Sequence, residues 1–270
     1  KNNINQLLGN IGNAYSKSSS YEKNKDIALE YQFRSLNIAK EIDDKRSMGH
    51  SLREIANVYA DKTRKSKNRN YNQALDFYSQ SEKVFKEIEY EAGVGNARHD
   101  RSWIYWEKGD YKQVLKDREY SLIKFEEIGQ EWASGLAMSS LGDYYLHTKN
   151  FGKALELIDR GYKVHEAIGS VSFKSSFLYS LGLINFYLNE HLIAIDYFEK
   201  TLSHIREAKK NVFTLRKGYI ILNLFYCYKV VGKTYDKQEI INYIKEENNR
   251  LYIWDDNWCI PYACFLGLHK

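Results

Sequence analysis

The sequence has almost no proline, a single residue in 270, and only sixteen glycines. So few turn-forming residues are not typical of an all-β chain with many tight turns, nor of a disordered one. No apolar run reaches the roughly 18 residues that a membrane-spanning helix needs. No signal-peptide pattern opens the chain. We therefore expect a helical protein that makes no contact with a membrane.

Cysteine is scarce as well. Cys227, Cys259 and Cys264 are too few and too clustered for a disulfide framework, which predicts a reducing, cytoplasmic compartment. The chain starts at Lys1 without a methionine and stops just after an apolar stretch. We expect it to be a piece of a longer protein, which leaves room for further domains.

What the sequence does contain is a repeat. The stretch IGNAY (Ile11–Tyr15) returns as IANVY, SWIY, LGDYY and LGLIN. The small residue of these stretches forms a first column: Gly12, Ala56, Ser102, Gly142 and Gly182. A second column follows in IALEY, QALDF, QVLKD, KALEL and IAIDY: Ala28, Ala74, Val114, Ala154 and Ala194. Within both columns the spacing is 40 to 46 residues, so the repeat is about 40 residues long.

Two further columns keep the same register. They are Ser35, Ser81, Ser121, Gly161 and Thr201, and then Ile42, Ile88, Ile128, Ile168 and Ala208. Because apolar residues between the columns fall at helical spacing, each repeat is predicted to be an antiparallel helix pair. The small residues would mark the crossing of its two helices. Asp43, Gly129 and Gly169 follow the second helix, where a left-handed residue commonly ends a helix.

In each repeat a tyrosine tends to follow the small residue by three positions, the motif Y-x-x-A-L comes after a short turn, and E-I-G ends the repeat. This order of motifs resembles the tetratricopeptide repeat (TPR). The 40-residue form is similar to that of kinesin light chains, Leu-Gly-Asn repeat proteins and bacterial TPR regulators. This resemblance implies an all-α, right-handed superhelical solenoid of about six helix-turn-helix repeats. The array would cover 1–250, with repeats at about 4–43, 45–89, 91–129, 131–169, 171–209 and 212–250, and 251–270 as a capping helix or the start of a further repeat.

The resemblance also implies that the first helix of each pair faces a concave groove that recruits a protein or peptide. Groove-facing positions would lie at offsets −3, +1 and +4 from the small residue. The candidate partner-binding residues are Arg53, Asn57, His99, Trp103, Trp106, Asp143, Tyr179 and Tyr226. Aromatic side chains suit the anchoring of a peptide or helix. The alternative is that some of them pack against neighbouring helices instead.

Some TPR domains hold the carboxylate at the end of a peptide with a clamp of Lys, Asn, Asn, Lys and Arg. Arg53 and Asn57 match the first two positions in chemistry. Asp100 occupies the next, and Leu136 and Ser140 stand where basic residues are expected. Because an aspartate repels a carboxylate, we expect no such clamp here.

Catalytic, metal and cofactor patterns are weak. Seven histidines are scattered without a pair at metal-binding spacing. The glycine-rich stretch Ala92–Ala97 lacks the third glycine and the preceding strand of a phosphate motif, and indicates a turn between repeats. The basic insertion Lys62–Asn70 has no interleaved aromatics, which favours a solvated loop over a nucleic-acid contact.

We therefore predict a non-enzymatic scaffold with no cofactor, no nucleic acid and a protein or peptide partner. Two alternatives stay open. One is a sensor or regulatory segment of a larger signalling or defence protein that carries a kinase, cyclase or protease domain. The other is a regulator similar to peptide-pheromone receptors.

Overall fold

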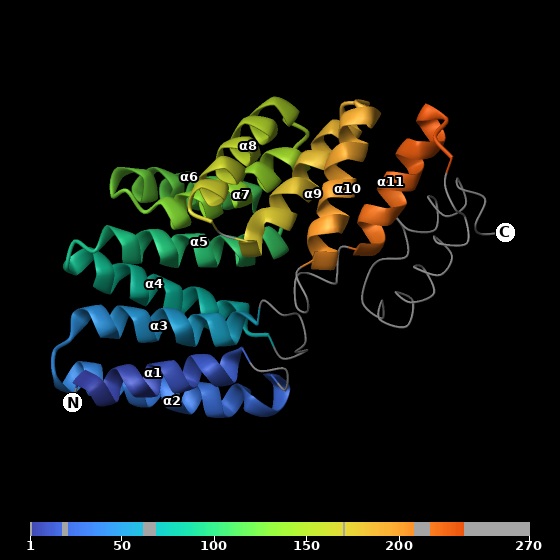
Figure 1. The fold of residues 1–270 in the computed structure, drawn as a ribbon. Helices are drawn as coiled ribbons and strands as arrows, with labels where there is room; N and C mark the ends of the chain where they lie inside the picture. The colour runs from blue at the N-terminus through green and yellow to red at the C-terminus, as the bar shows by residue number, and fades with distance from the viewer. Residues whose placement is uncertain (1, 18–20, 62–68, 170, 208–216, 235–270) are drawn as a thin grey trace. The chain divides into compact units, whose positions relative to one another are not determined.

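The computed structural model describes residues 2–17, 21–61, 69–169, 171–207 and 217–234. These residues form eleven α-helices and no strand (Figure 1). The helices are α1 (Asn2–Ser16), α2 (Tyr21–Glu41), α3 (Lys45–Ala60), α4 (Tyr71–Glu87), α5 (Glu91–Glu107), α6 (Tyr111–Glu127), α7 (Glu131–His147), α8 (Phe151–Ala167), α9 (Val171–Tyr187), α10 (His191–Glu207) and α11 (Lys217–Val231). The all-α prediction and the expected succession of helix pairs are confirmed. The predicted segment 251–270 lies outside the described residues.

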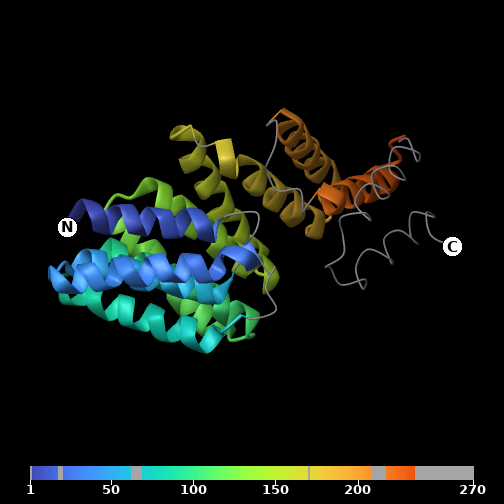
Figure 2. The ribbon, with the colours of Figure 1, turned by 90° about the horizontal axis from the view of Figure 1, so that it is seen from below.

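The chain divides into two compact units, residues 1–137 and 138–270. In the first unit each helix from α1 to α6 packs against the next, and α3 also touches α1 and α5 (Figures 1 and 2). In the second unit α8, α9, α10 and α11 pack in the same sequential way, and α11 also touches α9. The first helices of neighbouring pairs therefore lie side by side within a unit.

The helix ends follow from local chemistry. Several second helices begin after an Asn or Asp whose side chain accepts a hydrogen bond from the backbone N–H three residues later. These N-caps are Asn70, Asp110 and Asn150, and Asp44 does the same for α3. Gly129 and Gly169 have φ angles of 65° and 68°, and Asp43 has 51°. The predicted left-handed turn after the second helix is confirmed at these positions.

The columns of small residues lie where the two helices of a pair cross. A Cβ added to Gly142 would lie 2.5 Å from Ile158 Cδ1, and one added to Gly182 would lie 2.5 Å from Phe198 Cε1. The serine column makes a second close contact, since Ser81 Oγ donates a hydrogen bond of 2.8 Å to the carbonyl of the preceding helix. Backbones thus approach closely only because these positions carry small side chains.

The glycine-rich stretch Ala92–Ala97 is not a turn, which corrects the expectation from sequence. It forms the first turns of α5. A Cβ at Gly93 would lie 2.5 Å from Phe85 Cγ, and one at Gly95 would lie 2.8 Å from Phe125 Cε1. Because glycine has no side chain, the buried rings of Phe85 in α4 and Phe125 in α6 can pack against the backbone of α5. The role of both glycines is therefore packing.

We predict that Gly142→Leu lowers the free energy of unfolding by about 1–3 kcal/mol or more, because the buried Ile158 side chain cannot yield without strain. Urea titration followed by circular dichroism measures this. Gly152→Ala is the matched control in α8. No atom lies within 4 Å of its added Cβ, so that change should be neutral or slightly stabilising. Equal losses in both variants would contradict the assignment of Gly142 to a helix crossing.

Candidate functional site

Five predicted site residues lie on two adjacent first helices of the first unit. Arg53 and Asn57 are on α3, and His99, Trp103 and Trp106 are on α5. All five side chains are half-buried. We call the surface formed by Arg53, Glu54, Asn57, Asp100 and Trp103 the inner face of the first unit.

A polar network holds the α3 side of the inner face. Arg53 Nη2 donates to Glu54 Oε1 at 2.8 Å, and Arg53 Nε lies 3.7 Å from Asp100 Oδ2. Asn57 Nδ2 donates to Glu54 Oε2 at 3.2 Å. The hydroxyl of Tyr78, which reaches in from α4, donates to Asn57 Oδ1. These hydrogen bonds fix the orientation of side chains on α3, α4 and α5.

Two members of the network, Arg53 and Tyr78, have pKa values shifted upwards. Burial alone would lower the pKa of Arg53, but the Asp100 and Glu54 carboxylates raise it above its usual value. Burial, with Asp100 nearby, raises the pKa of Tyr78 well above its ordinary value. Arg53 therefore stays charged and already faces two carboxylates of its own chain. This arrangement competes with the docking of a terminal carboxylate.

The two tryptophans are each packed on one side. The Trp103 ring meets Tyr71 edge-on, with centroids 5.9 Å apart, and packs against the buried cluster that contains Tyr78. The Trp106 ring lies 5.5 Å from Tyr111, and the guanidinium of Arg118 stands 4.8 Å above it. Part of each ring remains exposed. Packing thus holds both rings in a fixed orientation.

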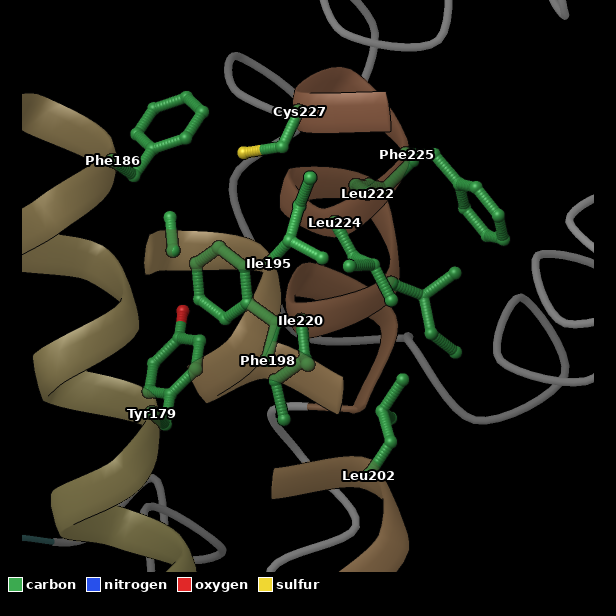
Figure 3. Packing of buried hydrophobic residues seen from close by; sticks show 12 residues of the cluster. Tyr179, Phe186, Ile195, Phe198, Leu202, Ile220, Leu222, Leu224, Phe225 and Cys227 are labelled. Atoms are coloured by element: carbon green, nitrogen blue, oxygen red, sulfur yellow. The ribbon is translucent and has the colours of Figure 1, made fainter. Parts of the chain in front are cut away.

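The remaining predicted residues belong to the second unit. Asp143 Oδ1 accepts a hydrogen bond of 3.3 Å from Ser180. Tyr226 is half-buried and lies 5.2 Å from Phe186. Tyr179 requires a correction, because its ring is only 9% exposed and packs 6.2 Å from Phe198 in the cluster of α9, α10 and α11 (Figure 3). It is a core residue, and we remove it from the candidate surface.

Sequence reasoning missed a buried ionic network between α4, α5 and α6. Arg101 forms two hydrogen bonds with the fully buried Asp117, of 2.7 and 2.9 Å. Its third nitrogen donates to Glu82 Oε2 at 2.6 Å. Arg98 and Lys86 each approach the other oxygen of Glu82 at 2.7 Å. The guanidinium of Arg98 also lies on the ring of Tyr120.

A signal for this network was present in the columns. One residue before the small residue of the first helix, the third repeat carries Arg101, whereas the other four carry Ile11, Ile55, Leu141 and Leu181. Three positions after the small residue of the second helix, the third repeat carries Asp117, whereas the other four carry Tyr31, Phe77, Leu157 and Tyr197. Two opposite charges at positions that are otherwise apolar indicate a buried ion pair.

Neither a metal site nor a membrane span is found in the described part of the chain. No three His, Cys, Asp or Glu residues there are placed to hold a metal ion. No helix within those ranges has the length and apolarity needed to cross a bilayer.

We predict that Asp117→Leu lowers the free energy of unfolding by about 3–5 kcal/mol, because it leaves a buried guanidinium without its main partner. The double change Arg101→Leu with Asp117→Leu should recover most of that loss, since other repeats carry apolar residues at both positions. Asp159→Leu, which breaks an exposed ion pair with Lys163, is the control and should change stability by under about 1 kcal/mol. Urea denaturation of the four proteins measures these differences in stability. A double variant no more stable than Asp117→Leu would contradict this account.

A pH dependence follows from Glu82. Burial raises the pKa of this carboxyl, but Lys86, Arg101 and Arg98 together lower it from 4.5 to about 2. A lowered folded-state pKa means that the stabilisation is complete above pH 4.5 and is lost as the pH falls towards 2. The stability difference between wild type and Glu82→Gln should therefore shrink over that range. A difference for Glu82→Gln that stays constant over that range would refute the assignment.

Comparison with known proteins identifies the fold and no more. No protein-family model matches the chain. No curated protein matches it in sequence either.

Solved structures do resemble it. BtubC (BKLC) from P. vanneervenii has a TM-score of 0.68 at 12% identity, covering 86% of this chain and 93% of that one. A signal transduction ATPase with a tetratricopeptide repeat sensor from Pyrococcus horikoshii has a TM-score of 0.67 at 16% identity, covering 98% of this chain and 38% of that one. A Rap protein complexed with competence and sporulation factor has a TM-score of 0.57 at 17% identity, covering 84% and 64%. The fold of this chain is a tetratricopeptide-type repeat of consecutive helix pairs.

Proposed function

We propose that this chain is a non-enzymatic cytoplasmic scaffold that recruits a protein or peptide through the inner face of the first unit. The observation that carries the proposal is the arrangement of Arg53, Glu54 and Asn57 beside Trp103. Tyr78 links the hydrogen-bonding groups to the ring, since its hydroxyl donates to Asn57 and Trp103 packs against the cluster that contains Tyr78.

The chemistry of this surface suits recognition. A partly exposed tryptophan that is packed on one side supplies apolar contact area, and tryptophan is enriched among residues that dominate binding energy. Asn57 already donates one hydrogen bond and accepts another, and its amide retains a second N–H and a second lone pair. Because the network orients these groups before binding, little side-chain freedom is lost when a partner docks.

Similar structures support this reading at the level of fold. The Rap protein is complexed with competence and sporulation factor, and the ATPase carries its tetratricopeptide repeats as a sensor. The second comparison favours the alternative of a sensor or regulatory segment. This chain matches only 38% of that ATPase, as a repeat segment within a longer protein would. In either case the inner face recognises the partner.

We predict that Trp103→Ala weakens binding of inner-face ligands by about tenfold or more, as loss of an aromatic anchor does. A displayed library of random peptides, selected on the wild-type chain, supplies the ligands, and fluorescence anisotropy measures their affinity. Trp132→Ala is the matched control, because that ring is 50% exposed and lies on α7 within the same unit. Unfolding curves establish that both variants fold. Selected peptides that bind Trp103→Ala and wild type equally would place the binding site elsewhere.

A further inference from the structure

The second unit has a cleft that no predicted site residue lines. It has a volume of about 490 Å³, and its lining residues come from α8, α9 and α10. Helix α9 packs against both α8 and α10. The lining residues that matter here are the leucines Leu178 and Leu181, the tyrosines Tyr162 and Tyr197, and the lysines Lys163, Lys174 and Lys200.

The interior of the cleft is apolar and aromatic. Leu178 and Leu181 come from α9 and are buried, and the half-buried rings of Tyr162 and Tyr197 come from α8 and α10 on either side. The Tyr162 hydroxyl donates to Glu166 Oε1 at 2.8 Å. Burial and that hydrogen bond raise the pKa of Tyr162 to about 12, so the hydroxyl remains protonated. The buried leucines and the two half-buried rings together offer an apolar surface to a bound side chain.

This interior differs from the ionic junction of α4, α5 and α6 in the first unit. At the same repeat positions that junction carries ions in place of apolar groups. Arg98 and Arg101 correspond to Leu178 and Leu181, and Glu82 and Asp117 correspond to Tyr162 and Tyr197. In the first unit the four charged side chains bond to one another across the junction. In the second unit the side chains at the same four positions are those of leucine and tyrosine, and they line the cleft.

The rim of the cleft is basic. Three lysines line it, against the two carboxylates of Asp159 and Glu166. Lys163 pairs with Asp159 and Lys200 with Asp196, both at 2.7 Å, while Lys174 lies 3.6 Å from Glu166. The side chains of Lys163 and Lys200 are 70% and 58% exposed. Exposed ion pairs of this kind contribute little, so an incoming carboxylate can replace the intrahelical partner at small cost.

Two of the lysines are also held near the aromatic rings. The ammonium of Lys174 lies 6.0 Å from the ring centroid of Tyr162, and that of Lys200 lies 5.8 Å from that of Tyr197. The positive charges therefore stand beside the apolar interior. A ligand that fits must carry an apolar group next to negative charge.

We propose that this cleft binds an acidic segment of a protein partner, which inserts a large apolar side chain between Tyr162 and Tyr197 and places neighbouring carboxylates on Lys163 and Lys200. This site is separate from the inner face. The two could hold different partners or two parts of one.

Three synthetic peptides of equal length test the proposal on the full chain. The first alternates Glu with Leu and Phe, the second has Lys in place of Glu, and the third has Ser in place of Leu and Phe. The acidic apolar peptide should bind, and the other two should bind at least about tenfold more weakly. Its affinity should fall as the salt concentration rises.

Charge reversal locates the site. Lys163→Glu with Lys200→Glu should weaken the acidic apolar peptide by about tenfold or more. The control is Lys112→Glu with Lys116→Glu, two exposed lysines on α6 whose reversal makes the same change in net charge. That control and Trp103→Ala should both bind as wild type does. Because Trp103→Ala removes the inner-face anchor, loss of peptide binding in that variant would show that the peptide binds the inner face.

Several results would overturn the proposal. They are no binding of the acidic apolar peptide to wild type, equal binding of the acidic and basic peptides, and unchanged affinity in Lys163→Glu with Lys200→Glu. A fourth is binding of phosphatidylserine vesicles, lost in that variant, without binding of the peptide. That outcome would assign the cleft to a lipid surface.

Discussion

Close crossing of paired helices is the constraint on which the rest of this structure depends. At Gly142 and Gly182 there is no space for even a Cβ, because Ile158 and Phe198 of the partner helix occupy it. The serine column adds a side-chain hydrogen bond to the backbone of the preceding helix at Ser81. These contacts set the distance and register between helices. As a result, the remaining side chains of one repeat occupy positions that recur in the next repeat.

Recurring positions allow the chemistry of one junction to differ from another without a change in backbone. Where the third repeat carries Arg101 and Asp117, the fifth carries Leu181 and Tyr197. The first pair forms a buried salt bridge, and the second pair lines a cleft. A buried ion pair is weak evidence for stability, since well-packed apolar residues often do as well. We infer that the ionic junction contributes to specific pairing of α4, α5 and α6, since breaking a buried ion pair leaves an uncompensated charge.

The sequence predicted those features that repeat. Helix pairs, their breaks and the left-handed turn at Gly129 all follow from columns that recur through the chain. Features that depend on a neighbouring helix were not predictable in this way. The helical offset placed Tyr179 on a groove, but its ring packs beside Phe198 of α10 in a buried cluster. Gly93 and Gly95 indicated a turn because nothing near them in the sequence explains glycine inside a helix. The explanation lies in the neighbouring helices, where the rings of Phe85 and Phe125 leave no space for a Cβ at these positions.

In a repeat fold each helix pair contacts only its neighbours, so the energetic effect of a substitution stays local. The inner face rests on α3, α4 and α5, whereas the basic cleft rests on α8, α9 and α10. No helix is shared between them. Changes at Trp103 and at Lys163 should therefore add independently in stability and in binding. A deviation from additivity for one partner would mean that this partner contacts both surfaces.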